Sequence, residues 1–274
     1  MELNPEINIV PETREKLSAQ ITEIITNINF GINIKVIPVS GLEIVDQLND
    51  AKIGLDNRAK TETDNKTESV FNGLDFDSNK TRVQAFALYD INLSEQIPVG
   101  VITIVIEPQK ILNEERYFER TDLGIVMRDY SDLIMSTTNE KITPNFIVMP
   151  AWTKVDQRYL GKFAIPGFRA IKNIIEVLET EAPLNTYFEM EAQGMANNAT
   201  KAYFHNIISE FKPGKEILFD DIITNTGMTN FKEILGQNTR GSDSTIKAAR
   251  LLGAKQANNY CGTSLGPVFI KKLK

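Results

Sequence analysis

The sequence is poor in the residues that build metal centres and disulfide frameworks. Its 274 residues include one cysteine, Cys261, and one histidine, His205. A single cysteine excludes an internal disulfide and a zinc site made of several cysteines, and we predict no metal centre. Because disulfides are rare where thiols are kept reduced, this composition favours a cytoplasmic protein.

Long apolar runs are missing as well. No stretch approaches the ~18 consecutive apolar residues that a membrane-spanning helix requires. The first residues, Met1 to Asn4, are acidic and polar, whereas a secretory signal has a basic start and an apolar core. We therefore expect neither a membrane span nor export.

An excess of positive charge is also absent. The formal net charge is -6 and the isoelectric point lies near 5.1, which argues against a chain that binds nucleic acid through its overall field. The hydrophobic content of 42% and the charged content of 24% are ordinary for globular proteins. We expect a soluble protein whose length fits one domain over residues 1–274.

Apolar periodicity in the first half predicts both helices and strands. Spacings of three and four indicate helices, and alternation indicates strands. The predicted elements are a helix over 12–29, a strand over 33–39, a capped helix over 40–48, and an antiparallel hairpin of strands 82–89 and 98–107. Residues 52–80 are rich in Asp, Asn, Lys and Thr and predict a long loop.

The second half shows the same alternation of element types. Residues 108–143 are mixed and predict some helix but no other clear element. A strand is predicted over 145–149, where Pro150 closes it before a loop, and a helix from Phe168 ends before Pro183. A strand over 184–192 and a helical stretch near 197–210 follow. The last predictions are a helix over 243–252 capped by Gly253 and a strand at 267–270. This order predicts an α+β fold with a mixed, mostly antiparallel central sheet flanked by helices.

Residues 146–161 carry the first part of a resemblance to a known family. Val148 and Pro150 end a strand, and Arg158 and Gly161 follow in a loop that leads toward a helix. This pattern resembles the coenzyme A signature of the GNAT acyltransferase superfamily, in which a strand ends in V-x-P and a loop of the form Q/R-x-x-G-x-G/A precedes a helix. A pyrophosphate needs converging backbone N–H donors and the positive end of a helix dipole, which such a loop supplies.

The sequence departs from this signature at three residues. Phe163 stands where the family has Gly or Ala, and Pro166 and Gly167 stand where the helix should already be running. We therefore expect the helix to start late, with Pro166 in its first turn.

The closing part of the chain carries the second part of the resemblance. Ser242, Ile246, Gly253 and the strand at 267–270 are similar to the family's closing helix and two strands, in which N-x-x-S-I precedes a helix ending in L-G-F or L-G-A. The resemblance covers most of residues 33–274. The segments that look like expansions are 52–80, 108–143 and 193–240.

The resemblance implies a cosubstrate, a reaction and a set of binding residues. The strands at 145–149 and 184–191 would splay apart and admit the acyl-pantetheine arm of acetyl-CoA or a longer acyl-CoA. The residues implied for cofactor binding are Val148, Met149, Arg158, Leu160, Gly161, Lys162 and Phe163. The implied reaction is direct transfer of the acyl group to an amine, as in N-acetyltransferases.

Such a transfer needs a base, because an alkylamine is mostly protonated at neutral pH. We predict Glu191 as the base, with Glu189 second, since positions two apart on a strand share a face. The alternative is that both carboxylates belong to the solvated face of an edge strand. His205 is another candidate base because it titrates near neutrality.

The acid that protonates the leaving thiolate is a tyrosine in many family members, on a helix where this chain has Ala249. Tyr203 is the substitute candidate, because Asn197 and Ala199 precede it in a similar pattern. The alternative for Tyr203 is a packed or surface tyrosine. Cys261 has no sequence support as a nucleophile.

Two other functions stay open at this point. The donor is an acyl carrier protein in relatives of the N-acyl amino acid and acyl-homoserine lactone synthases, which share the fold. A GNAT-like module that holds acyl-CoA without turnover is the second alternative. The sequence determines neither the acceptor, nor the acyl length, nor the oligomeric state.

Overall fold

The computed structural model describes most of the elements that the sequence predicts. The described residues are 11–30, 33–39, 82–93, 98–108, 117–155, 159–192, 203, 216–235, 243–262 and 265–274. The predicted helix over 40–48, the predicted loop over 52–80 and all but Tyr203 of the helical stretch near 197–210 lie outside these ranges.

Ten strands make up one sheet that is mostly antiparallel, with helices flanking it. Their order in the sheet is β1-β2-β3-β6-β7-β10-β9-β4-β5-β8. The predicted α+β class is therefore confirmed. The chain falls into two compact units, of which unit 1 comprises residues 1–106, 152–186 and 273–274, and unit 2 comprises residues 107–151 and 187–272.

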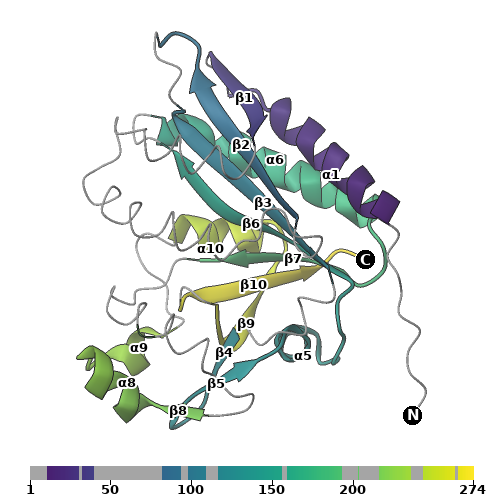
Figure 1. The fold of residues 1–274 in the computed structure, drawn as a ribbon. Helices are drawn as coiled ribbons and strands as arrows, with labels where there is room; N and C mark the ends of the chain where they lie inside the picture. The colour runs from purple at the N-terminus through teal and green to yellow at the C-terminus, as the bar shows by residue number, and fades with distance from the viewer. Residues whose placement is uncertain are drawn as a thin grey trace. The chain divides into compact units, whose positions relative to one another are not determined.

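Unit 1 holds the elements predicted for the first half of the chain (Figure 1). They are α1 (Pro11–Thr26), β1 (Ile34–Val39), β2 (Arg82–Asp90) and most of β3 (Gly100–Pro108). Leu17, Ile21 and Ile25 are buried on one stripe of α1, as their spacing predicts. The predicted hairpin is confirmed, because β2 and β3 pair antiparallel with Phe86 opposite Ile102.

The helix α6 (Leu160–Glu181) begins earlier than predicted. Pro166 lies inside it and not in its first turn, so the expectation of a late start is wrong. The carbonyl of Tyr159 accepts the N–H of Phe163 at 3.1 Å, and the buried ring of Phe163 lies 4.4 Å from that of Phe30. This packing anchors the first turn, and the helix then continues past a proline that lacks one N–H donor.

The strand β6 (Phe146–Val155) also differs from its prediction. It does not end at Pro150 but continues for five residues beyond it, so the predicted loop does not begin at Pro150. Proline fixes φ near a value that extended backbone tolerates, so it removes a single ladder donor without ending the strand. The division between the two units falls within β6, between Ala151 and Trp152.

Unit 2 contains strands within residues 108–143 that the mixed sequence pattern there did not predict. A short hairpin of β4 (Tyr117–Arg120) and β5 (Gly124–Arg128) is followed by α5 (Tyr130–Thr138). The predicted expansion near 193–240 contributes β8 (Glu216–Leu218), α8 (Phe219–Thr226) and α9 (Phe231–Ile234). Strands of four and five residues are too short for a clear alternating pattern.

Three closing elements of the chain agree with their predictions, namely β7 (Thr186–Glu191, of which Thr186 belongs to unit 1), α10 (Asp243–Leu251) and β10 (Pro267–Lys272). The strand β9 (Lys255–Cys261) was implied by the family resemblance alone, without bounds. Gly253 has φ +80° directly after α10, which confirms it as the helix cap. β10 lies between β7 and β9 and pairs antiparallel with both.

The described residues of unit 2 include two hydrophobic clusters. The tyrosine cluster contains Tyr117, Tyr130, Leu133, Ile134, Ile147, Tyr187, Ala257, Tyr260, Val268 and Ile270. The phenylalanine cluster contains Phe118, Ile125, Met127, Ile217, Phe219, Ile222, Phe231, Leu235, Cys261 and Leu265. Within the described part of the chain, no helix has both the length and the apolar character needed to cross a membrane.

Candidate active site

The first predicted carboxylate, Glu189, is a buried group with a specific partner. Only 3% of its surface is exposed, and the hydroxyl of Tyr117 donates a hydrogen bond to its Oε2 atom at 2.7 Å. Tyr117 comes from β4, 72 residues earlier in the sequence, and its ring packs edge-on against Tyr130 at 5.3 Å. The interpretation of a solvated strand face is therefore wrong for Glu189, and β7 is not an edge strand.

The second carboxylate, Glu191, has a different environment on the same strand. It lies opposite Val268 of β10 and is half-buried, so that part of the side chain is accessible. Its carboxylate lies against the backbone of Gly262, in the position that a β-carbon of residue 262 would occupy. The two glutamates thus differ in access, since Glu189 is enclosed by protein and Glu191 is not.

Cys261 adjoins this pair but has no nucleophilic character. The residue is 1% exposed, and its thiol donates to the carbonyl of Phe118 at 3.6 Å. Burial, followed by the charge of Glu191, raises the pKa of the Cys261 thiol far above its usual range. A thiol that stays protonated at neutral pH is a poor nucleophile.

Tyr203 lies with the other cluster of unit 2. It is half-buried and packs against the phenylalanine cluster, whereas Glu189 bonds to a member of the tyrosine cluster. Burial, followed by the charge of Asp221, raises the pKa of Tyr203. Its role as the acid stays a prediction.

The predicted pyrophosphate cradle lies at the start of α6 in unit 1. The N–H groups of Lys162 and Phe163 donate to the carbonyl of Tyr159, at 2.8 and 3.1 Å. Leu160 and Gly161 occupy the first two helical positions, where no intrahelical acceptor exists for an N–H group. A β-carbon at Gly161 would meet nothing within 4 Å, so the backbone is open to an approaching group there.

The same helix start carries a carboxylate. The hydroxyl of Tyr159 donates to Asp90 at 2.7 Å, and the Nζ atom of Lys162 lies 5.9 Å from the centre of the Tyr159 ring. The Tyr159 hydrogen bond is the largest of several effects that lower the pKa of Asp90, and the Lys162 charge contributes to them. Asp90 is thus an anion that would repel a second anion bound at this helix terminus.

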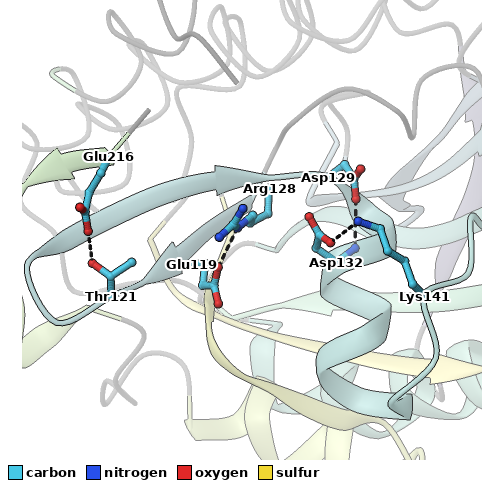
Figure 2. Close-up of polar contacts among 7 residues, drawn as sticks. All are labelled: Glu119, Thr121, Arg128, Asp129, Asp132, Lys141 and Glu216. Atoms are coloured by element: carbon cyan, nitrogen blue, oxygen red, sulfur yellow. Dashed lines mark hydrogen bonds and ion pairs between the residues drawn. The ribbon is translucent and has the colours of Figure 1, made fainter. Parts of the chain in front are cut away.

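The β4–β5 hairpin and α5 carry the polar network drawn in Figure 2. The Nε atom of Arg128 contacts Glu119 at 2.7 Å, Lys141 contacts Asp132 at 2.7 Å, and Thr121 donates to Glu216. Asp129 caps α5 by accepting the N–H of Asp132. We interpret this network as structural, because Arg128 and Lys141 each form an ion pair with a carboxylate of an adjacent element.

The closing segment has a charge distribution that the sequence reasoning missed. Residues 244–274 contain six lysines and arginines and no acidic residue, whereas residues 1–243 contain 24 basic and all 36 acidic residues. Lys247 and Arg250 are exposed on α10, and Leu251 beside them is 68% exposed. No ion pair to these two cations is found within the described residues.

The remaining predicted residues lie either in unit 2 or outside the described residues. Val148 is buried in β6 of unit 2, and Met149 packs against the tyrosine cluster. Arg158 and His205 lie outside the described residues. Among the residues that the structure describes, no group of three or more His, Cys, Asp or Glu side chains is arranged to hold a metal ion.

Comparisons with known proteins leave the family open. No protein-family profile matches the sequence, and no curated protein matches it significantly. Among solved structures, the chain is similar to arginine/ornithine succinyltransferase subunit AI from Pseudomonas aeruginosa, with 14% identity, 88% of this chain and 77% of that chain covered, and a TM-score of 0.48. A likeness this distant says nothing about activity, so the function has to be inferred from the chain's own residues.

Proposed function

We propose that this protein transfers an acyl group directly from acyl-CoA to an amine. The observation that carries the proposal is the environment of Glu191, a half-buried carboxylate at the end of β7 beside a cysteine that is buried and protonated. An accessible base beside a thiol that stays protonated suits direct transfer better than a covalent acyl-enzyme formed on Cys261. The sequence resemblance at 146–161 and 242–270 supplies the acyl-CoA assignment.

The reaction balances with one base. Glu191 accepts a proton from the acceptor ammonium, and the free amine attacks the thioester carbonyl. A C–N bond forms and the C–S bond breaks, so the products are an amide, the coenzyme A thiol and one released proton. The thiolate takes its proton from the nitrogen of the collapsing tetrahedral adduct or from Tyr203, the acid candidate.

The start of α6 would hold the coenzyme A pyrophosphate. The N–H groups of Leu160 and Gly161 and the exposed side chain of Lys162 supply donors and charge, and the open space beside Gly161 leaves room for approach. Asp90 opposes this binding, so we expect the affinity to depend on the Lys162 charge.

The first prediction tests acyl-CoA binding by thermal shift. Acetyl-CoA or a longer homologue should raise Tm, because a ligand that binds the folded state alone stabilises it by about 2.7 kcal/mol at one hundred times Kd. Gly161→Val should remove this shift while the unliganded Tm is retained, since a β-carbon at this position meets nothing within 4 Å. If no acyl-CoA shifts Tm at millimolar concentration, the cosubstrate is wrong. A retained shift in Gly161→Val would move the pyrophosphate site elsewhere.

One observation favours an acyl carrier protein as the alternative donor. Carrier proteins are acidic, and the exposed Lys247 and Arg250 lie in a segment without any acidic residue. Thiol release from matched acyl-CoA and acyl-carrier donors, with the same amine panel, separates the two.

A second observation favours an acyl-CoA-binding module without turnover. Ala249, where the family's tyrosine acid would stand, is fully buried and has no proton to donate. A Tm shift without thiol release from any donor and amine would support this module.

A further inference from the structure

We infer that Gly262 positions Glu191. Because Gly262 has no side chain, the catalytic carboxylate of Glu191 can occupy the space beside its backbone. A β-carbon added to Gly262 would overlap the carboxyl carbon and both carboxylate oxygens of Glu191. The catalytic role of Glu191 rests on the proposed function. The contact between its carboxylate and Gly262 is a geometric feature of unit 2 that does not depend on that function. Nothing in the sequence pattern singled out Gly262.

The backbone of Gly262 does not itself require glycine. The described glycines with positive φ are Gly227 and Gly253, and Gly262 is not one of them, so an L-residue suits its conformation. Its position is held on both sides, because its N–H donates to Gly266 at 3.1 Å and its carbonyl accepts the N–H of Leu265 at 2.9 Å. Among the described residues, the space that Glu191 fills is therefore what demands glycine at this position.

The backbone of Glu191 is held equally well. Glu191 pairs with Val268 in the β7–β10 ladder, and the next residue, Ala192, donates to the carbonyl of Pro267 at 3.0 Å. When neither backbone moves, a methyl group at position 262 must displace the end of the Glu191 side chain. That end is flexible, so the displacement costs little stability but moves the proton acceptor, and a misplacement of ~1 Å at a reacting group can lower a rate by ~10²-fold.

The test compares three variants with the wild-type enzyme in the thiol-release assay, using an acceptor amine found by the panel screen. Gly262→Ala should lower kcat by ~10²-fold with KM for acyl-CoA unchanged and Tm nearly unchanged. Glu191→Gln should give a similar loss, and the double variant should be no slower than Glu191→Gln alone, because both changes remove the same proton acceptor. Gly167→Ala is the matched control, since a β-carbon there meets nothing within 4 Å, and it should keep the wild-type rate.

An NMR measurement that needs no turnover tests the position of the Glu191 carboxylate independently of the proposed reaction. With ¹³C-labelled glutamate, the side-chain carboxyl resonance that disappears in Glu191→Gln should shift in Gly262→Ala and stay in place in Gly167→Ala. If wild-type protein releases no thiol with any amine, the proposed function fails, while a shifted resonance still establishes the contact between Glu191 and Gly262. If the wild type is active and Gly262→Ala keeps its rate, or if the two losses multiply in the double variant, the positioning role is overturned.

Discussion

At the scale of single residues, a buried carboxylate needs a hydrogen-bond donor, and Glu189 has one in Tyr117. The two residues come from β7 and β4, and both are at most 5% exposed. A buried acceptor that loses its donor costs more free energy than the hydrogen bond contributed, since water does not replace the donor. The bond therefore holds the β4–β5 hairpin to the centre of unit 2.

Removing this donor should destabilise the protein. We expect Tyr117→Phe to lower the free energy of unfolding by about 1–3 kcal/mol in urea denaturation, the range for losing a buried hydrogen-bond donor. Tyr187→Phe is the matched control: the Tyr187 hydroxyl is buried and has no hydrogen-bond partner among the described residues, so its loss should be neutral or stabilising. Equal losses in the two variants would contradict a specific role for the Tyr117 hydroxyl.

The pH dependence of activity tests Glu191 as the base. Glu191→Gln keeps the shape but accepts no proton, so we expect kcat to fall by ~10²-fold near neutral pH. The defect should shrink as pH rises, because more of the amine arrives deprotonated. Rates measured across this range for both proteins check the prediction. A defect of constant size at every pH would point to structural damage, and a full rate would leave the proton to His205 or to an ordered water.

At this scale the sequence predicted part of the local structure around the candidate site. The alternation of residues 184–192 correctly placed Glu189 and Glu191 two apart on one strand. It did not predict that Glu189 is enclosed, because enclosure depends on Tyr117, a residue 72 positions away in a hairpin too short to recognise. The sequence did not indicate Gly262 for a similar reason, because a contact between residues 191 and 262 produces no periodic pattern in the sequence.

At the scale of elements, α6 shows how tertiary packing overrides a local rule. The pair Pro166 and Gly167 predicted a helix that starts late, yet the helix runs through both residues. Phe163 anchors the preceding turn by packing on Phe30, a residue 133 positions earlier that the local pattern does not connect to this helix. β6 also departs from a local rule, since it continues beyond Pro150 to Val155.

The proline should therefore carry a measurable cost. Pro166→Ala restores an N–H donor for the carbonyl of Lys162, four residues before it, and removes a ring that clashes with that carbonyl. We expect the free energy of unfolding to rise by about 1–3 kcal/mol in urea denaturation. Gly167→Ala, the next residue, gives the scale of an ordinary helix improvement at about 1 kcal/mol. A Pro166→Ala protein less stable than the wild type would mean that the surrounding packing requires the proline.

At the scale of the whole molecule, charge is distributed unevenly along the chain. Residues 1–243 carry a formal charge of -12, from 24 basic and 36 acidic residues, and residues 244–274 carry +6. Interactions between exposed charges are screened beyond about 10 Å at 0.1 M salt. A local excess of this kind therefore acts on partners that come close, and the acidic average of the chain hides it.

Charge reversal on α10 tests which donor this segment serves. If the donor is an acyl carrier protein, Lys247→Glu with Arg250→Glu should lower kcat/KM for that donor by about tenfold or more at low salt, mostly through slower association. The effect should weaken as salt is added and should be smaller with the matching acyl-CoA. An equal loss with both donors would argue against docking of a carrier protein at α10.

The position of β10 has a consequence for the synthesis of the protein. β10 joins β7 to β9, but it follows both of them in the chain. The ribosome therefore synthesises β7 and β9 before β10, which pairs with both. Until β10 has been synthesised, β7 and β9 each expose an unpaired backbone edge. Nascent chains that stop before Pro267 should be substrates for chaperones or proteases, because unit 2 becomes a continuous sheet only after synthesis has passed Lys272.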